Sequence, residues 1–76
     1  MTALISLVAD VLRVPSTEVD WDTGTSTSAA WTSLRHVELV MRVEREYGIK
    51  LTAREARTCR SVRRLHDVLV EKGVQV

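Results

Sequence analysis

The chain has 76 residues, which is enough for one small domain with one modest core. Hydrophobic residues make up 45% of it and charged residues 28%, a balance typical of a folded globular protein rather than a disordered one. The single cysteine, Cys59, excludes an intramolecular disulfide and a cysteine-based metal cluster, and no apolar run reaches membrane-spanning length. We therefore expect one domain over residues 1–76, soluble in the cytoplasm, with no membrane partner.

The first predicted element is a helix near the N-terminus. Thr2 can cap its start, and Pro15 ends it because the ring disfavours helical geometry at the preceding residue. Its apolar residues recur at helical spacing: Leu4, Ile5, Val8, Val11 and Leu12. From Ser16 to Ala30 the chain is rich in Ser, Thr, Asp and Gly, which predicts a long loop anchored to the core by Val19 and Trp21.

The longest predicted helix runs from about Ser33 to Tyr47 and ends at Gly48, a residue suited to the left-handed position that closes many helices. Its apolar residues form two stripes. The inner stripe, which we expect to face the core, contains Leu39, Val40, Val43 and Tyr47. The outer stripe, offset by about a third of a turn, contains Leu34, Val37 and Met41. A single buried face does not require this second stripe, so it is a candidate partner surface.

Two shorter helices are predicted in the second half of the chain. Thr52 and Glu55 have the spacing of a capping box, and Ser61 can cap a last helix that ends at Gly73. The inward stripe of this last helix contains Val62, Leu65, Val68 and Leu69. Without any strand pattern, the periodicity predicts an all-α fold: four helices, a long loop between the first two, and a short third helix.

The run from Ser33 to Leu51 reads S-L-x-x-V-E-L-V-M-x-V-E-x-E-Y-G-I-x-L. It resembles the segment that follows the modified serine of acyl carrier proteins and the related peptidyl carrier domains. The resemblance continues through Ser61 into the last helix, so it covers nearly the whole chain. It implies a four-helix bundle of acyl-carrier type. One position departs from the family pattern, because the residue before the serine is usually Asp and here is Thr32.

By this resemblance, a transferase attaches 4'-phosphopantetheine from coenzyme A to the hydroxyl of Ser33, and the terminal thiol of the arm holds an acyl or peptidyl group as a thioester. The protein would be a discrete monomeric carrier, not an enzyme, in polyketide, nonribosomal peptide or related biosynthesis, including antibiotic biosynthesis. Its partners would be a phosphopantetheinyl transferase, an acyl- or aminoacyl-loading enzyme, and synthase or tailoring enzymes. The residues expected to contact these partners are Thr32, Leu34, Arg35, Val37, Glu38, Met41 and Glu44.

Several of these residues also have simpler interpretations. Ser33 could be only a helix cap, worth about 1 kcal/mol, and Glu44 could be a solvated surface charge. His36 is expected to be packed or bonded to a loop, His66 to lie on the surface, and Cys59 to be a small buried hydrophobe. We assign no catalytic residue and no metal ligand.

Charge is unevenly distributed. Up to Leu51 the chain has five Lys or Arg against seven Asp or Glu, and from Thr52 it has six against three. The second half includes a cluster of arginines at Arg54, Arg57, Arg60, Arg63 and Arg64. Such a cluster can indicate a small helical DNA-binding domain. The net charge of only +1 favours instead a docking surface for an acidic enzyme, or solubility, and no nucleic-acid partner. A third interpretation is an unmodified, carrier-like interaction module.

Overall fold

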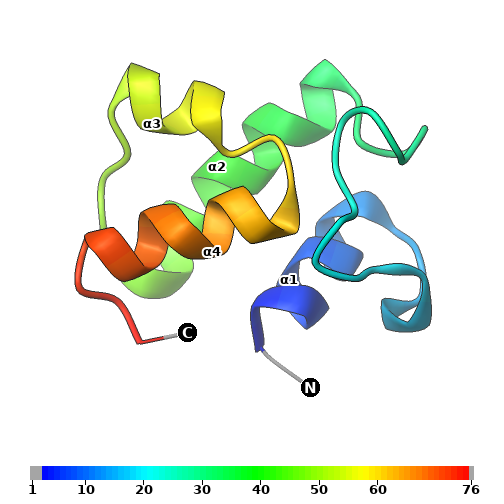
Figure 1. Cartoon of the computed structure of the whole chain (residues 1–76), viewed down its shortest axis with the longest axis horizontal. Coiled ribbons are helices and arrows are strands. Elements are labelled where there is room, and N and C mark those ends of the chain that lie inside the picture. Colours follow the sequence, from blue (N-terminus) through cyan, green and yellow to red (C-terminus); the bar gives the residue numbers. More distant parts are fainter. Residues whose placement is uncertain (1–2, 76) are drawn as a thin grey trace.

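The computed structural model describes residues 3–75. Its helices are α1 (Ala3–Leu12), α2 (Ser33–Tyr47), α3 (Ala53–Thr58) and α4 (Val62–Glu71), and a 3-10 turn, η1 (Ser16–Glu18), follows α1 (Figure 1). The described residues contain no strand, only an isolated bridge between Gly24 and Ser61. The all-α prediction, with its long loop and short third helix, is confirmed. The proposed cap at Thr2 lies outside the described residues.

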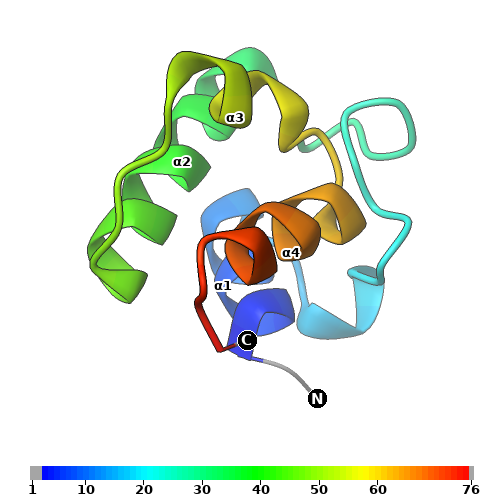
Figure 2. The same ribbon diagram turned by 60° about the vertical axis from the view of Figure 1, so that its left-hand side comes forward.

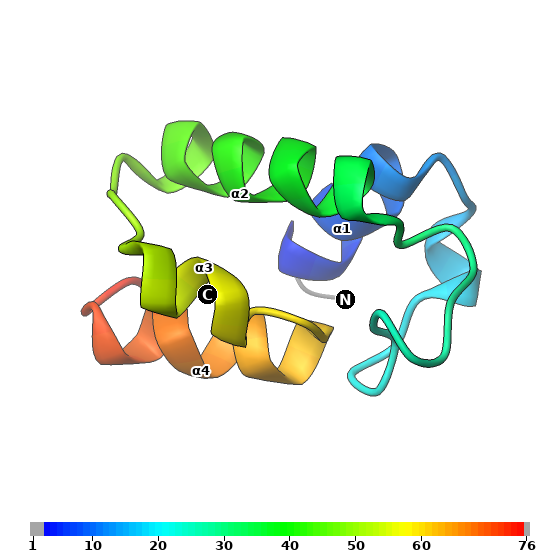
Figure 3. The same ribbon diagram turned by 90° about the horizontal axis from the view of Figure 1, so that it is seen from above.

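The helices surround a core to which α1 contributes most. α1 contacts η1, α2 and α4, and α3 contacts α4; Figure 2 shows α1 next to α4, with α2 and α3 around them. In Figure 3, α2 and α4 lie along opposite edges of the molecule. Because α1 is enclosed in this way, Leu7 and Ala9 are buried together with the apolar stripe predicted for it. The sequence pattern alone did not indicate that these two residues are buried.

Predicted inward stripes on the other helices are mostly confirmed. All four residues of the α4 stripe are buried. In the inner stripe of α2, Leu39 and Val43 are buried, whereas Val40 and Tyr47 are only half-buried. The predicted inner stripe of α2 is therefore wider than the fully buried one, which consists of Leu39 and Val43.

Local capping explains where the helices start and stop. Thr52 and Glu55 form the predicted capping box of α3, and the Ser61 hydroxyl accepts the N–H of Arg64 at the start of α4. Gly48 closes α2 with φ at 64°, in the left-handed region. α1 ends earlier than Pro15 requires, because Arg13 already has a left-handed φ of 60°.

The long loop between α1 and α2 is held by specific contacts. Val19 is buried, and Trp21 packs against the core with its ring edge-on to His66 at a centroid distance of 5.0 Å. His66 is thus half-buried, and the prediction that it is a simple surface residue is wrong. The N–H of Thr25 donates to the carbonyl of Arg60 at 2.9 Å, and a Cβ at Gly24 would collide with that same carbonyl. A side chain at Gly24 would therefore push the loop away from the junction of α3 and α4.

Candidate functional site

Ser33 is exposed and is the first residue of α2. The cap is the preceding residue, Thr32, whose Oγ1 accepts the backbone N–H of Arg35 at 3.3 Å. The interpretation of Ser33 as the capping serine is therefore wrong, because α2 begins at Ser33 itself, one residue earlier than that role requires. Within residues 3–75 the Ser33 hydroxyl has no hydrogen-bond partner, so it is free to react.

Backbone donors are also free at this helix start. Neither the N–H of Ser33 nor that of Leu34 has an acceptor in the part of the chain that the structure describes. The first turn of α2 contains no acidic residue, so no carboxylate there offsets the positive end of the helix dipole. These features favour an anion, such as a phosphate, next to Ser33.

A partly buried hydrogen-bonded pair fixes the position of this helix start. Trp31 is 3% exposed, and its Nε1–H donates to Nδ1 of His36 at 3.1 Å. Nε2 of His36 lies 2.7 Å from the carbonyl oxygen of Ala56 in α3. A neutral imidazole with its proton on Nε2 satisfies both contacts. This confirms the predicted structural role of His36, and it joins the loop, α2 and α3 beside Ser33.

The outer stripe is as exposed as the sequence pattern suggested. Leu34 is 68% exposed, Val37 55% and Met41 64%. Together with Ser33, these side chains form an apolar surface along the first half of α2. Exposing large apolar side chains to water is unfavourable, and such a surface is typical of a site that binds other proteins.

Charged residues near the outer stripe already have intramolecular partners. Arg35 and Glu38 form an ion pair with an N–O distance of 3.1 Å. The carboxylate of Glu44 accepts the backbone N–H of Leu51 at 2.7 Å and so holds the connection between α2 and α3. The interpretation of Glu44 as a merely solvated charge is therefore wrong. The partner-binding roles of Glu38, Arg35 and Glu44 stay predictions.

A groove of about 440 Å³ runs beside the start of α2. The residues that line it come from the long loop, from α2 and from the junction of α3 and α4: Thr25, Trp31, Thr32, Ser33, His36, Val37 and Arg60. The sequence assigned Arg60 only to the arginine cluster and did not predict its position in this groove. Its position next to Ser33 depends on the packing of the α3–α4 junction against the loop, which periodicity does not reveal.

Among residues 3–75, no group of three or more His, Cys, Asp or Glu side chains is placed to hold a metal ion. None of the helices in this part of the chain has both the length and the apolar character needed to cross a bilayer.

Comparison with known proteins agrees with this geometry. The family model described as phosphopantetheine attachment site matches residues 2–69, which is most of the chain. No curated protein matched the sequence.

Proposed function

Because the chain belongs to the phosphopantetheine attachment family, we propose that it is an acyl or peptidyl carrier protein with its arm on Ser33. Family membership shows a carrier domain whose cofactor is covalent 4'-phosphopantetheine. When attached, this group supplies a terminal thiol that holds the cargo as a thioester. Domains of this family are typically non-catalytic, and we propose the same for this chain.

The observation that carries the proposal is the hydroxyl of Ser33, which is exposed and has no hydrogen-bond partner among the described residues. Attachment would form a bond between Oγ of Ser33 and the phosphorus of the arm, with loss of the hydroxyl proton, cleavage of the pyrophosphate bond of coenzyme A and release of adenosine 3',5'-bisphosphate. The resulting phosphodiester would meet the free N–H groups of Ser33 and Leu34. None of the described residues that line the groove on the same side carries a carboxylate that would repel the phosphate. The residues present therefore fit the group.

A second serine at a helix start provides a useful contrast. Ser61 precedes α4, but its Oγ accepts the N–H of Arg64 at 3.2 Å, and its side chain is only partly exposed. Modifying Ser61 would disturb a cap worth about 1 kcal/mol. Ser33 has no such role, so it is the better attachment residue.

Intact-mass measurement tests the assignment. After incubation of the protein with coenzyme A and a broad-specificity phosphopantetheinyl transferase, we expect one added phosphopantetheine on the wild type and on Ser61→Ala. Ser33→Ala should gain none while keeping the helical circular dichroism of the wild type. A wild type that stays unmodified, or a loaded Ser33→Ala, would contradict the proposal; the unmodified result would support the carrier-like interaction module.

We also propose that the transferase and the loading, synthase or tailoring enzymes contact the outer stripe, with Thr32, Arg35, Glu38 and Glu44 at its edges. The exposure of the outer stripe supports this role. Met41→Glu would place a charge in the apolar contact. We expect it to lower the loading rate at least tenfold, whereas Lys50→Glu, a charge change at an exposed position beyond α2, should change the rate less than twofold.

The pathway we propose is polyketide, nonribosomal peptide or related biosynthesis, served by a cytoplasmic monomer. The departure at Thr32 and the arginine-rich second half support a dedicated set of partner enzymes. Mass spectrometry of the protein purified from its native host would identify the cargo. An amino acid or polyketide intermediate would support the proposal, and ordinary fatty acyl chains would contradict it.

We propose an acidic enzyme surface, rather than nucleic acid, as the partner of the arginine cluster. The net charge of +1 supports this choice, since nucleic-acid-binding domains usually carry a strong basic excess. A gel-shift experiment with duplex DNA at low and moderate salt checks it. Steeply salt-sensitive binding would contradict the proposal.

A further inference from the structure

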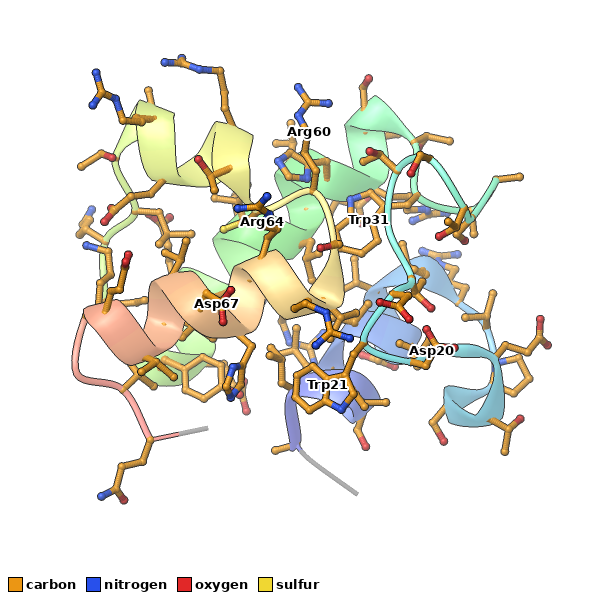
Figure 4. The ribbon with its side chains drawn as sticks, viewed as in Figure 1. Asp20, Trp21, Trp31, Arg60, Arg64 and Asp67 are labelled. Atoms are coloured by element: carbon orange, nitrogen blue, oxygen red, sulfur yellow. The ribbon has the colours of Figure 1, made fainter. Side chains whose placement is uncertain are left out.

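Arg60 lies in the junction between α3 and α4 and lines the same groove as Ser33. Figure 4 shows it above Trp31, between α3 and the start of α2. We propose that Arg60 binds the phosphate of the phosphopantetheine arm and thereby orients the arm along the groove. This inference rests on the attachment at Ser33 proposed above.

Arg60 provides the positive charge of the groove. The other groove residues have hydroxyl, apolar or aromatic side chains, and His36 is neutral in the hydrogen-bonded form described above. With Thr32 before the serine in place of the usual Asp, the sequence also lacks a carboxylate next to the attachment point. A phosphodiester on Ser33 would therefore introduce a negative charge opposite an arginine that has no acidic competitor in the groove.

The backbone of Arg60 is firmly held. Its carbonyl accepts the N–H of Thr25 at 2.9 Å, and its own N–H donates to the carbonyl of Thr58 at 2.7 Å. These bonds connect the residue to the long loop and to the end of α3. The Cα and Cβ atoms of Arg60 are therefore held in place beside the groove.

The guanidinium of Arg60 is partly oriented before any ligand arrives. Its Nε–H donates to the carbonyl of Arg57 at 3.0 Å. Its terminal nitrogens form no ion pair with any carboxylate among the described residues. Two terminal NH₂ groups of one planar guanidinium match the two free oxygens of a phosphodiester. Part of the side-chain freedom of Arg60 is therefore already restricted before binding.

The attachment geometry brings the two groups together. The phosphorus would be bonded directly to Oγ of Ser33, a residue that lines the groove together with Arg60, so the phosphate would lie at this groove. The free N–H groups at the start of α2 would bind it from one side, and Arg60 would bind it from the other. Arg60 is a positioning residue in this role, since it takes no part in bond formation.

The test compares apo and phosphopantetheine-loaded protein in three forms: wild type, Arg60→Gln and Arg64→Gln. Arg64 is a matched control because it is an exposed arginine on α4 that does not line the groove and has no ion pair among the described residues. Loading is first checked by intact mass. The thermal midpoints of the apo and loaded forms are then measured at low salt.

We expect loading to raise the midpoint by about 1–8 °C in the wild type and in Arg64→Gln, as one exposed ion pair would in a domain of this size. In Arg60→Gln this increase should shrink to the part that the N–H groups at the start of α2 contribute. In the wild type it should shrink in about 1 M salt, where the screening length is about 3 Å. An equal increase in wild type and Arg60→Gln would overturn the inference.

A second measurement needs no variant. In ¹⁵N-arginine-labelled wild type, loading should shift the side-chain signal of Arg60 and leave that of Arg64 in place. An unshifted Arg60 signal in protein proven to be loaded would overturn the inference while leaving the attachment at Ser33 intact. Failure of the wild type to load would instead overturn the proposed function.

Discussion

Helices α1 and α2 pack against each other but differ greatly in how they use their apolar residues. α1 buries seven of its ten residues, whereas α2 buries only Leu39 and Val43 of its fifteen. The reason is position, because α1 is enclosed by η1, α2 and α4, while the outer stripe of α2 faces solvent. Apolar side chains on α1 stabilise the fold, and those of the outer stripe are available to partners.

Two substitutions on α2 itself give the largest test of this difference. Leu39→Ala leaves a cavity at a position that is 1% exposed, so we expect a loss of about 2–5 kcal/mol in the free energy of unfolding. Met41→Ala removes a side chain that is mostly in water and should change the free energy of unfolding by less than about 0.5 kcal/mol. Urea unfolding measures both. Similar losses would mean that the outer stripe is part of the core.

Thiol reactivity provides a second test of the difference between buried residues and the exposed outer stripe. Burial, with the nearby charge of Glu55 adding to it, raises the pKa of the Cys59 thiol from 9.0 to about 11. The thiolate population at pH 8 should therefore be about 100-fold lower than in the unfolded chain, and the reaction with a thiol reagent slower by at least that factor. A cysteine introduced in the outer stripe of Cys59→Ala protein, Val37→Cys, should react at nearly the unfolded rate. A fast-reacting native Cys59 would show that the α3–α4 junction opens.

The two adjacent hydroxyl residues at the start of α2 should differ in their contribution to the free energy of unfolding, by a smaller amount than Leu39 and Met41. Thr32→Ala removes the cap and should cost about 1 kcal/mol of stability. Ser33→Ala removes a hydroxyl with no partner in the described chain and should cost less than about 0.5 kcal/mol. Chemical denaturation of the two variants measures the difference. The reverse order of stabilities would restore Ser33 as the cap.

The smallest expected effect is the loss of stability in acid that comes from the capping box of α3. The backbone N–H of Thr52 and the ammonium of Lys72 bind the Glu55 carboxylate and lower its pKa below 4.5. A lowered pKa in the folded state stabilises the fold above the unfolded pKa, and this contribution is lost as the pH falls through the folded value. Wild type should therefore lose more stability than Glu55→Gln between pH 5 and about pH 3. Equal losses in the two proteins would contradict this role.

Much of the fold could be predicted because its signals are local. The bounds of α2 follow from the hydroxyls before it and from Gly48 after it, and the capping box of α3 lies within four consecutive residues. The sequence left open whether Ser33 is the cap, because Thr32 and Ser33 are both suitable and only the backbone dihedrals distinguish them.

The sequence did not allow contacts between distant parts of the chain to be predicted. The burial of Trp31 and its bond to His36 depend on how the loop meets α2. The contact of Glu44 with Leu51 depends on the path of the chain after Gly48. Arg60 reaches the groove only through the docking of the α3–α4 junction on the loop. Each requires side chains to be placed in three dimensions, which apolar periodicity does not specify.

Capping by Thr32 has a consequence for the attachment of the arm proposed at Ser33. If Ser33 held the helix start together, esterifying its oxygen would break that hydrogen bond. With that bond made by its neighbour, the same backbone accommodates the serine whether it is free or substituted. The scaffold can then remain rigid while only the tethered chain moves from one enzyme to the next.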